Sequence, residues 1–550
     1  MKRIVLKNIV ALVLIGLFVS IGVSSMLQKA PTCDEASHHI ASGYVYLTKG
    51  DIRFSTEVPP LSRYIVALPL LALDMDLPED SSFWRRDDRG AFSREFLYKL
   101  NDNSGQVVFL SRLMILLVAL FGGVFLFLWT KRRLSTEVAL MSLFFYCLSP
   151  NIIAHSVLAT TDMTAAVFIM CAVLTFWDFL RSLRAGTVIF SGVFLALALL
   201  SKFSALLLVP LFFLLYLGMP AISPTERRKA NLLMLLGVMG IAVFVVWAGY
   251  GFEMKPVLED TLRSGEKVAL ARKALSVFGT ELQGKGIAVL ESVPLPLSSF
   301  LLGILGIIKH GAEGSRVFFA GQWSDSGNPF YYILAMGIKT PIPLIILFLG
   351  GIVAAVRGTY KVLVRYLMLI IIVFVAAASF SDLQLGLRYI LPVYPLAFIV
   401  ISIGIKEMVT RFRASKVIVG GLMAWYLVGS ILVWPHYLSY FNEVIGGPDN
   451  GYKYLRDSNI DWGQDLPALK SYMDDNNLES ITMSYFGSAD PGYYGIKYDE
   501  INAEERVSPG NKVYAVSAQY LEGVEWATDR EPSAKAGYSI FIYDLREVRE

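Results

Sequence analysis

Apolar segments separated by short polar stretches constrain this chain more than any other feature. A helix needs about 20 mainly apolar residues to cross a bilayer. Candidate spans lie near residues 7–27, 107–130, 135–150, 156–180, 186–201, 203–220, 231–250, 332–356, 363–380, 387–405 and 415–434. The chain is 55% hydrophobic and only 17% charged, against about 25% charged residues in soluble proteins. The sequence therefore predicts an all-α polytopic membrane protein with about 11 transmembrane helices.

The basic residues alternate with these segments in a way that predicts orientation. Lys131–Arg133, Arg227–Lys229 and Lys406–Lys416 fall in alternate loops, in phase with the basic start of the chain. Because basic short loops stay in the cytoplasm, we expect the N-terminus inside and the C-terminus outside. The first segment also fits a cleaved signal peptide. We interpret it as a span, since no small-x-small cleavage site follows it; its loss would leave the other orientations unchanged.

Three polar regions lie on the predicted outer side. Two are loops, 28–106 and 251–331, and the second contains an apolar run, Leu295–Ile308, too short to span and expected on the membrane surface. The third follows the last span, which divides the chain into a membrane domain, 1–435, and a small extracytoplasmic α/β domain, 436–550. In this domain we predict a helix and three strands, at Asp465–Met473, Ser480–Phe486, Lys512–Leu521 and Tyr538–Tyr543.

Charged residues at the outer ends of the spans are the main candidates for function. They are Asp34, Arg63, Arg112, Asp162, Lys202, Lys339 and Arg388. Each alone is explained by a side chain that extends to the membrane surface. Together they indicate a site, because charges within membrane segments are costly and tend to be functional. The net charge of +3 comes from scattered short clusters and gives no indication of nucleic-acid binding.

Acids and bases on one face are suited to an anionic lipid substrate. Arg and Lys bind phosphate, and a carboxylate acts as a general base. Apolar surroundings raise the pKa of a carboxylate, whereas neighbouring bases lower it. The sequence therefore leaves the direction of the pKa shift at these acids open. No cofactor is evident in the sequence. Two acids can hold a divalent cation, but the sequence contains no complete ligand set for one.

Several motifs occur in a fixed order around these charges. They are Asp34-Glu35, Glu57-x-Pro59-Pro60-Leu61, Thr161-Asp162, the Lys202 hairpin and Leu385-Gly386-Leu387-Arg388-Tyr389-x-Leu391-Pro392. This set resembles the phospholipid-carrier-dependent glycosyltransferases, the superfamily of the protein O-mannosyltransferases and the lipid A aminoarabinose transferases. Tyr440–Glu443, Gly446–Pro448 and Asp457–Asp465 are similar to a bacterial branch of it.

The resemblance implies a GT-C fold and an inverting transfer of a sugar from a polyprenyl-phosphate donor to an acceptor on the outer face of the bacterial cytoplasmic membrane. It implies that Asp34 is the catalytic base, Glu35 a supporting residue and Asp162 a second acid. Arg63, Arg112, Lys202 and Arg388 would bind the donor phosphate. The implied partners are the lipid-linked donor, a lipid, glycan or protein acceptor, and membrane lipids, with no nucleic acid.

Two departures from the mannosyltransferases stand out. Those enzymes place a His three residues after the first acid, whereas here His38 and His39 come four and five residues after Asp34. The C-terminal region also carries no β-trefoil repeat. Both argue against a close match to that branch.

The sequence leaves open an alternative function and two roles for one motif. A polytopic lipid or glycan transporter also buries charges among helices, but its charges tend to lie near the bilayer midplane in inverted repeats. The Asp457–Asp465 stretch, which contains three acids and a Trp, either connects the last span to the outer domain or lines the site.

Overall fold

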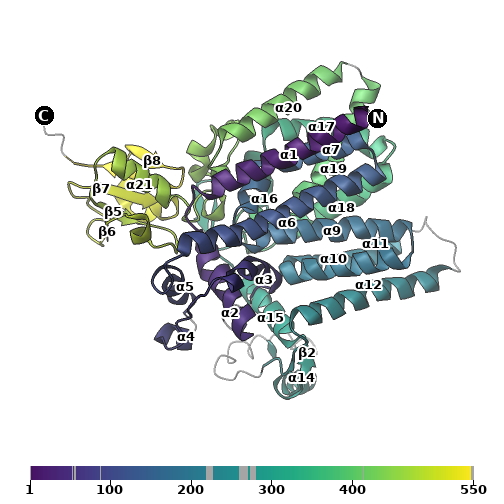
Figure 1. Cartoon of the computed structure of the whole chain (residues 1–550), viewed down its shortest axis with the longest axis horizontal. Helices are drawn as coiled ribbons and strands as arrows, with labels where there is room; N and C mark the ends of the chain where they lie inside the picture. The colour runs from purple at the N-terminus through teal and green to yellow at the C-terminus, as the bar shows by residue number, and fades with distance from the viewer. Residues whose placement is uncertain are drawn as a thin grey trace.

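The computed structural model is dominated by long helices that lie side by side, with a small sheet at one end (Figure 1). It describes residues 2–218, 227–258, 271–272 and 280–546, apart from Arg53, Ser55, Thr56, Asp87 and Arg413. The predicted fold class, an all-α multi-pass membrane protein with a small C-terminal α/β part, is confirmed.

Within these ranges, seven helices are long and apolar enough to cross a membrane, or up to nine if each of two bent pairs is one span. The seven are α1 (Lys2–Met26), α6 (Ser104–Arg133), α9 (Thr161–Arg181), α12 (Arg227–Gly249), α18 (Lys361–Ser379), α19 (Val393–Arg411) and α20 (Ser415–Leu432). The bent pairs are α7 (Thr136–Cys147) with α8 (Pro150–Ser156), and α16 (Tyr331–Lys339) with α17 (Ile342–Arg357). The two other predicted spans, 186–201 and 203–220, are shorter helices: α10 (Ala185–Ser201), and the 3₁₀ turn η4 (Phe203–Leu207) followed by α11 (Leu208–Gly218).

Proline residues explain where the structure interrupts the predicted spans. Pro341 separates α16 from α17, which bend by 111°, and Pro150 begins α8 after a bend of 63°. Proline has no N–H to donate and clashes with the preceding turn. The span predicted at 332–356 is therefore a broken helix, and the one predicted at 387–405 starts as a 3₁₀ turn, η7 (Leu387–Ile390), before Pro392.

Close helix packing forms the core of the bundle. Helix α9 packs against α6, α10 and α19 and is buried over nearly its whole length. Small residues permit close approach of apolar helices: a Cβ atom at Gly404 on α19 would lie 2.7 Å from the Gly351 carbonyl oxygen on α17. Buried tyrosines add hydrogen bonds between helices, such as Tyr366 to the Val173 carbonyl at 2.7 Å.

The two long loops fold into short helices and hairpins. The first contains the π-helical turn η1 (Glu35–Ile40), α2 (Ala41–Lys49), α3 (Leu61–Ala67), the 3₁₀ turn η3 (Leu68–Ala72), α4 (Ser82–Arg86) and α5 (Arg89–Tyr98). In its described part the second contains α14 (Thr280–Ser292), α15 (Ser298–Glu313) and the strand pairs β1 (Met254–Lys255) with β2 (Leu295–Pro296) and β3 (Val317–Phe319) with β4 (Gln322–Ser324). The apolar run Leu295–Ile308 is thus mostly helical, while its place on the membrane surface stays a prediction.

The C-terminal part is a five-stranded sheet in the order β6-β5-β7-β9-β8. Its elements are α21 (Leu466–Asp475), β5 (Ile481–Ser484), β6 (Tyr498–Glu500), β7 (Val513–Ser517), α22 (Glu525–Thr528), β8 (Ala534–Ala536) and β9 (Ile540–Asp544). The predicted helix and three strands are confirmed. Strand β6 pairs in parallel with β5, and β8 pairs in an antiparallel way with β9. These two edge strands were not predicted, because three-residue segments carry too little periodicity to detect.

The close crossing of α17 and α19 predicts a specific sensitivity. We expect Gly404→Leu to destabilise the protein by about 1–3 kcal/mol, because the new side chain overpacks the contact with Gly351. Gly420→Leu on α20 is the matched control, since a Cβ atom there meets nothing within 4 Å. Thermal unfolding in detergent measures both, and equal stability of the two variants would contradict the prediction.

Candidate functional site

Asp34 lies where the chain leaves α1 and enters η1. The Cys33 N–H donates to the Trp462 carbonyl at 2.9 Å and the Ala30 N–H to the Gln464 carbonyl at 3.0 Å. The segment before Asp34 is therefore fixed to the stretch 460–464, which follows the last span. Single π-helical turns are frequent at functional sites, and this one starts directly after Asp34, whose side chain is 26% exposed.

Four charged side chains, which we call the charge chain, form a continuous series with alternating sign. Arg388 Nη1 donates to Asp34 Oδ2 at 2.8 Å and lies 3.8 Å from Asp162 Oδ2. Lys202 Nζ donates to Asp162 Oδ1 at 2.6 Å. The four residues come from four separate parts of the chain: the end of α1, the first turn of α9, the C-terminus of α10 and η7. The structure thus brings together four of the seven site residues that the sequence suggested.

Aromatic rings flank the two bases of the charge chain. The Arg388 guanidinium carbon lies 4.3 Å from the centroid of the Trp462 ring, and Lys202 Nζ lies 4.2 Å from that of Tyr389. Cation–π contacts of this kind hold a base in place without neutralising it. Neither ring was among the predicted site residues. Trp462 lies inside the Asp457–Asp465 stretch, and this motif is the sequence feature that could have identified it as a site residue.

Glu35 points away from Asp34 and is fully buried. It accepts two hydrogen bonds from Arg112, each at 2.8 Å, and one from the Ala159 backbone N–H at 2.7 Å. Arg112 also donates to the carbonyls of Met26, Lys29 and Ala30. The pair therefore joins the end of α1, α6 and the turn before α9, and it lies outside the charge chain.

Arg63 also lies outside the charge chain, beneath η1. It is buried on α3 and donates to the His38 carbonyl at 3.0 Å and to the Tyr46 hydroxyl at 3.1 Å. Lys339 is likewise buried, and it donates to the carbonyls of Leu438 and Asn459. Both cations satisfy backbone groups of the segments that surround the site.

The electrostatics around Asp34 favour its ionised form. Burial raises the pKa of the carboxyl, but the charge of Arg388 outweighs it, with smaller contributions from His38 and His39 where these are protonated, so the pKa lies below its usual value of 3.8. Burial, followed by the charge of Arg63, lowers the pKa of His39 to about 3. Burial also lowers the pKa of His38, whose Nδ1 lies 3.9 Å from Asp34 Oδ1. At neutral pH both histidines are uncharged and Asp34 is a carboxylate.

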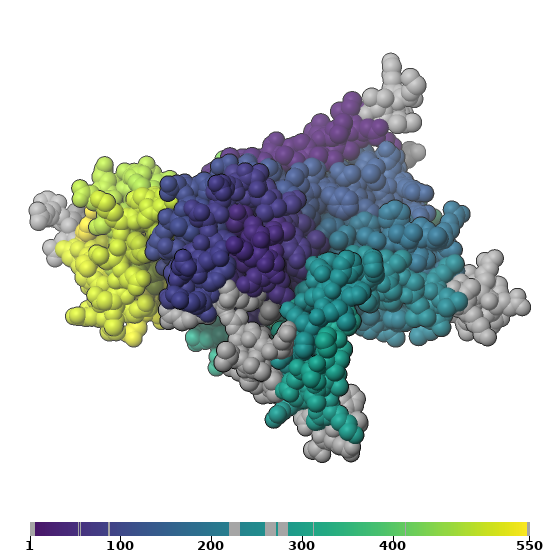
Figure 2. Space-filling view, turned by 60° about the horizontal axis from the view of Figure 1, so that its bottom comes forward, coloured from purple at the N-terminus to yellow at the C-terminus, as the bar shows by residue number. Residues whose placement is uncertain are grey.

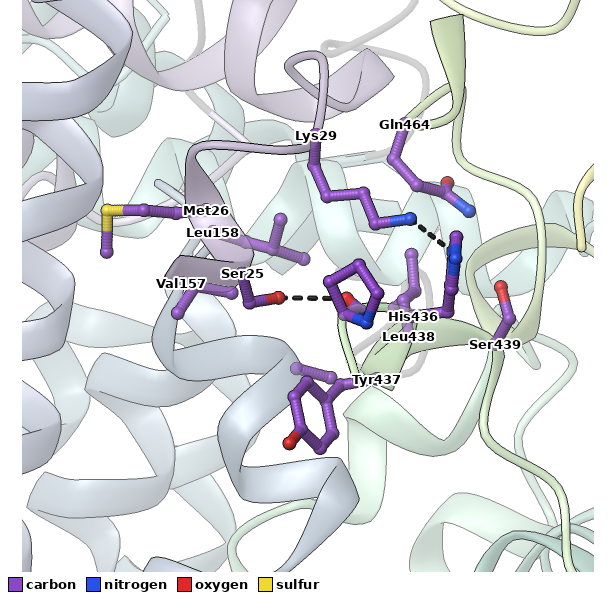
Figure 3. Close-up of a pocket in the computed structure, with 12 residues that line it drawn as sticks. Ser25, Met26, Lys29, Val157, Leu158, His436, Tyr437, Leu438, Ser439 and Gln464 are labelled. Carbon is purple, nitrogen blue, oxygen red and sulfur yellow. Dashed lines mark hydrogen bonds between the residues drawn. The ribbon is translucent and has the colours of Figure 1, made fainter. Parts of the chain in front are cut away.

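A second ionic cluster fixes the end of α1 to the C-terminal part. Lys29 Nζ lies 2.6 Å from Asp465 Oδ1. It also lies 2.5 Å from His436 Nδ1, the contact drawn in Figure 3. Asp465 also accepts a hydrogen bond from the Ser539 hydroxyl at 2.8 Å. Asp461 accepts from the backbone N–H groups of Gly463 and Gln519. Asp461 and Asp465 thus connect the bundle to the sheet, as the structural interpretation of this stretch expected.

The described ranges contain no cluster of side chains that could bind a metal ion. No group of three or more His, Cys, Asp or Glu side chains there is arranged to hold a metal ion.

Comparison with known proteins supports the resemblance seen in the motifs. Residues 90–248 match the family model described as dolichyl-phosphate-mannose-protein mannosyltransferase. The matched region contains Arg112, Asp162 and Lys202. No curated protein sequence matches the chain.

Solved structures of two membrane glycosyltransferases are similar to the whole chain. ArnT from Cupriavidus metallidurans bound to undecaprenyl phosphate is 13% identical, with 100% of this chain and 98% of that chain covered and a TM-score of 0.48. The Archaeoglobus fulgidus oligosaccharyltransferase in complex with Zn and sulfate is 11% identical, with 93% and 70% covered and a TM-score of 0.41.

The Glu35–Arg112 pair leads to a prediction about stability. We expect Glu35→Gln to cost about 3–5 kcal/mol, because it leaves the buried Arg112 charge without its counter-ion. Glu137→Gln is the control, since that carboxylate is 54% exposed and pairs with Lys7 at the surface. Unfolding midpoints of the purified variants in detergent test this, and a Glu35→Gln protein as stable as the control would contradict it.

Proposed function

We propose that the chain is an integral-membrane inverting glycosyltransferase that moves a sugar from a polyprenyl-phosphate donor to an acceptor hydroxyl or amine. The observation that carries the proposal is the charge chain, in which an ionised carboxylate and two bases lie within one set of contacts. The match to a family named for a dolichyl-phosphate donor supports a lipid-linked phosphate as the leaving group.

Asp34 is the proposed base. In a single displacement the acceptor oxygen or nitrogen forms a bond to the anomeric carbon while the bond from that carbon to the phosphate oxygen breaks. The acceptor proton passes to Asp34, and the polyprenyl phosphate leaves as an anion. A phosphate leaving group needs no protonation when cations stabilise it, so one carboxylate and a basic clamp suffice.

Arg388 and Lys202 are the proposed clamp. Arg388 Nη1 already lies near both acids, and Lys202 is held by Asp162. Asp162 then orients the two cations and offsets their mutual repulsion until the donor phosphate binds between them. Arg63 and Arg112 receive a positioning role instead, because their guanidinium groups donate to protein acceptors beneath and beside η1.

The site is proposed to face the outer side of the bacterial cytoplasmic membrane. The charge chain uses helix ends and the segment after α1, and these lie at the end of the bundle that carries the C-terminal sheet (Figure 1). The basic loops Lys131–Arg133 and Arg227–Lys229 belong to the opposite helix ends, and basic loops stay inside. A location at one membrane face rather than at the midplane favours a transferase over the transporter alternative.

The role of Asp34 predicts a large loss of activity. We expect Asp34→Asn to lower sugar transfer from a polyprenyl-phosphate donor at least ~100-fold, the usual contribution of a positioned base, while the protein still inserts and binds donor. Asp102→Asn is the control, because that side chain is exposed next to α6. Release of polyprenyl phosphate by the purified protein measures the step. Unchanged transfer in Asp34→Asn would remove Asp34 as the base.

The contact of Arg388 with Asp34 predicts a pH shift. Transfer falls as pH drops through the pKa of Asp34, which Arg388 lowers against the effect of burial. We expect Arg388→Gln to raise that pKa, so that the acid limb of the kcat/KM profile moves to higher pH, whatever the loss in rate. Lys202→Gln is the matched control: it removes the other base but not the contact with Asp34, so its limb should stay in place. An acid limb at the same pH in both variants would contradict the assignment.

A further inference from the structure

A polar cavity lies between the first loop and the C-terminal sheet, apart from the charge chain. Its volume is about 490 Å³, within the range of about 300–1,000 Å³ typical of small-molecule sites. In the space-filling view the C-terminal part adjoins the region near residue 100 (Figure 2). The cavity is lined by α5, the loop 484–491, β6 and the segment around Arg506.

Bases and tyrosines from different elements converge on this cavity. Arg94 lies on α5 and Lys99 directly follows it. Arg506 comes from the segment after β6, and Tyr498 and Tyr520 come from the side of the sheet. Both tyrosines are well exposed, at 39% and 40%. The Arg94 side chain makes no hydrogen bond or ion pair with any described residue, so its guanidinium is available to a ligand.

This set of side chains fits a sugar that carries an acidic group. A tyrosine offers an apolar ring face together with a hydroxyl, which suits the faces and hydroxyls of a pyranose. Arg forms paired hydrogen bonds with carboxylate or phosphate. Two acids, Asp490 and Glu500, also line the cavity, and they provide acceptors for sugar hydroxyls.

Both walls of the cavity are hydrogen-bonded to the segment that carries Asp34. On one wall the Ser488 hydroxyl donates to the carbonyl of Cys33, the residue before Asp34, at 3.0 Å. On the other, the Ser93 hydroxyl on α5 donates to the Ser37 carbonyl of η1 at 3.4 Å. Ser93 packs toward η1 while its neighbour Arg94 faces the cavity.

The loop 484–491 packs closely against the stretch 460–464, which is itself hydrogen-bonded to the segment before Asp34. The Tyr485 hydroxyl donates to the Gly463 carbonyl at 2.6 Å. Gly463 has φ +86°, and a Cβ atom there would lie 2.7 Å from Gly487 Cα, so only glycine permits this approach. The wall that this loop gives the cavity is therefore preformed, and its Ser488 is bonded to Cys33, the residue before the proposed base.

We infer that this cavity is the acceptor subsite and that it binds an acidic glycan. The inference rests on the proposed function. It names the substrate class: a glycan, free or attached to a lipid, whose carboxylate or phosphate pairs with Arg94 and whose sugar rings contact Tyr498 and Tyr520. A neighbouring sugar of the same glycan then reaches Asp34 past Ser488 and Cys33.

Binding of small oligosaccharides to the full-length protein in nanodiscs tests the subsite. The probes are tetragalacturonate, neutral maltotetraose and an extended threonine-rich peptide. We expect tetragalacturonate to bind more tightly than the other two, and Arg94→Glu to raise its Kd at least tenfold. Arg530→Glu is the matched control, because this arginine of the C-terminal part is exposed and does not line the cavity. Tyr498→Ser should also weaken tetragalacturonate binding.

Hydrolysis of the donor in the absence of acceptor separates this inference from the proposed function. In that reaction a water oxygen bonds to the anomeric carbon in place of the acceptor, its proton passes to Asp34, and polyprenyl phosphate is released. Arg94→Glu should leave that release unchanged. A tetragalacturonate Kd that does not change in Arg94→Glu would overturn the subsite even if the donor is cleaved. Tighter binding of maltotetraose or the peptide would also overturn it. Binding that depends on Arg94 in a protein that never cleaves the donor would instead overturn the proposed function and leave an acidic-glycan site.

Discussion

The buried carboxylate of Glu35 and the buried guanidinium of Arg112 hold the site together. A charge among apolar helices is costly unless it is paired and hydrogen-bonded. Here the guanidinium meets Glu35 and three carbonyls from the end of α1, while Glu35 also accepts from the turn before α9. This pairing fixes three elements at one point, and Asp34 and Asp162 follow directly from two of them.

The same requirement shapes the charge chain. Two acids and two bases alternate, so each cation lies beside a carboxylate, and rings of Trp462 and Tyr389 cover the bases. A donor phosphate would replace carboxylate contacts on Arg388 and Lys202 with its own. Under the proposed function, binding of the donor would thereby release Asp34 from its ion pair and leave it free to accept a proton.

The C-terminal part contributes to the site instead of lying apart from it. The stretch 457–465 supplies Trp462 and the backbone that fixes Cys33, and Ser488 in the loop 484–491 donates a hydrogen bond to the Cys33 carbonyl. The boundary proposed at residues 435 and 436 therefore separates elements by composition, while side chains and backbone groups from both sides of it surround Asp34.

Local pattern was sufficient to predict much of this protein from sequence. Long apolar runs are visible without any knowledge of contacts, so the membrane helices, the C-terminal helix and three of the strands were predictable. Asp34, Asp162, Lys202 and Arg388 could also be singled out as candidates, because an ion at the end of an apolar helix stands out against its neighbours; their role in a site stays a proposal. The tertiary structure decided the rest. Adjacent Asp34 and Glu35 look equivalent in sequence, but η1 turns one toward Arg388 and buries the other against Arg112. The partners of Arg63 and Arg112 are mostly backbone carbonyls, which every residue possesses. Only the folded chain therefore reveals that these two cations lie outside the charge chain, to which Arg388 and Lys202 belong.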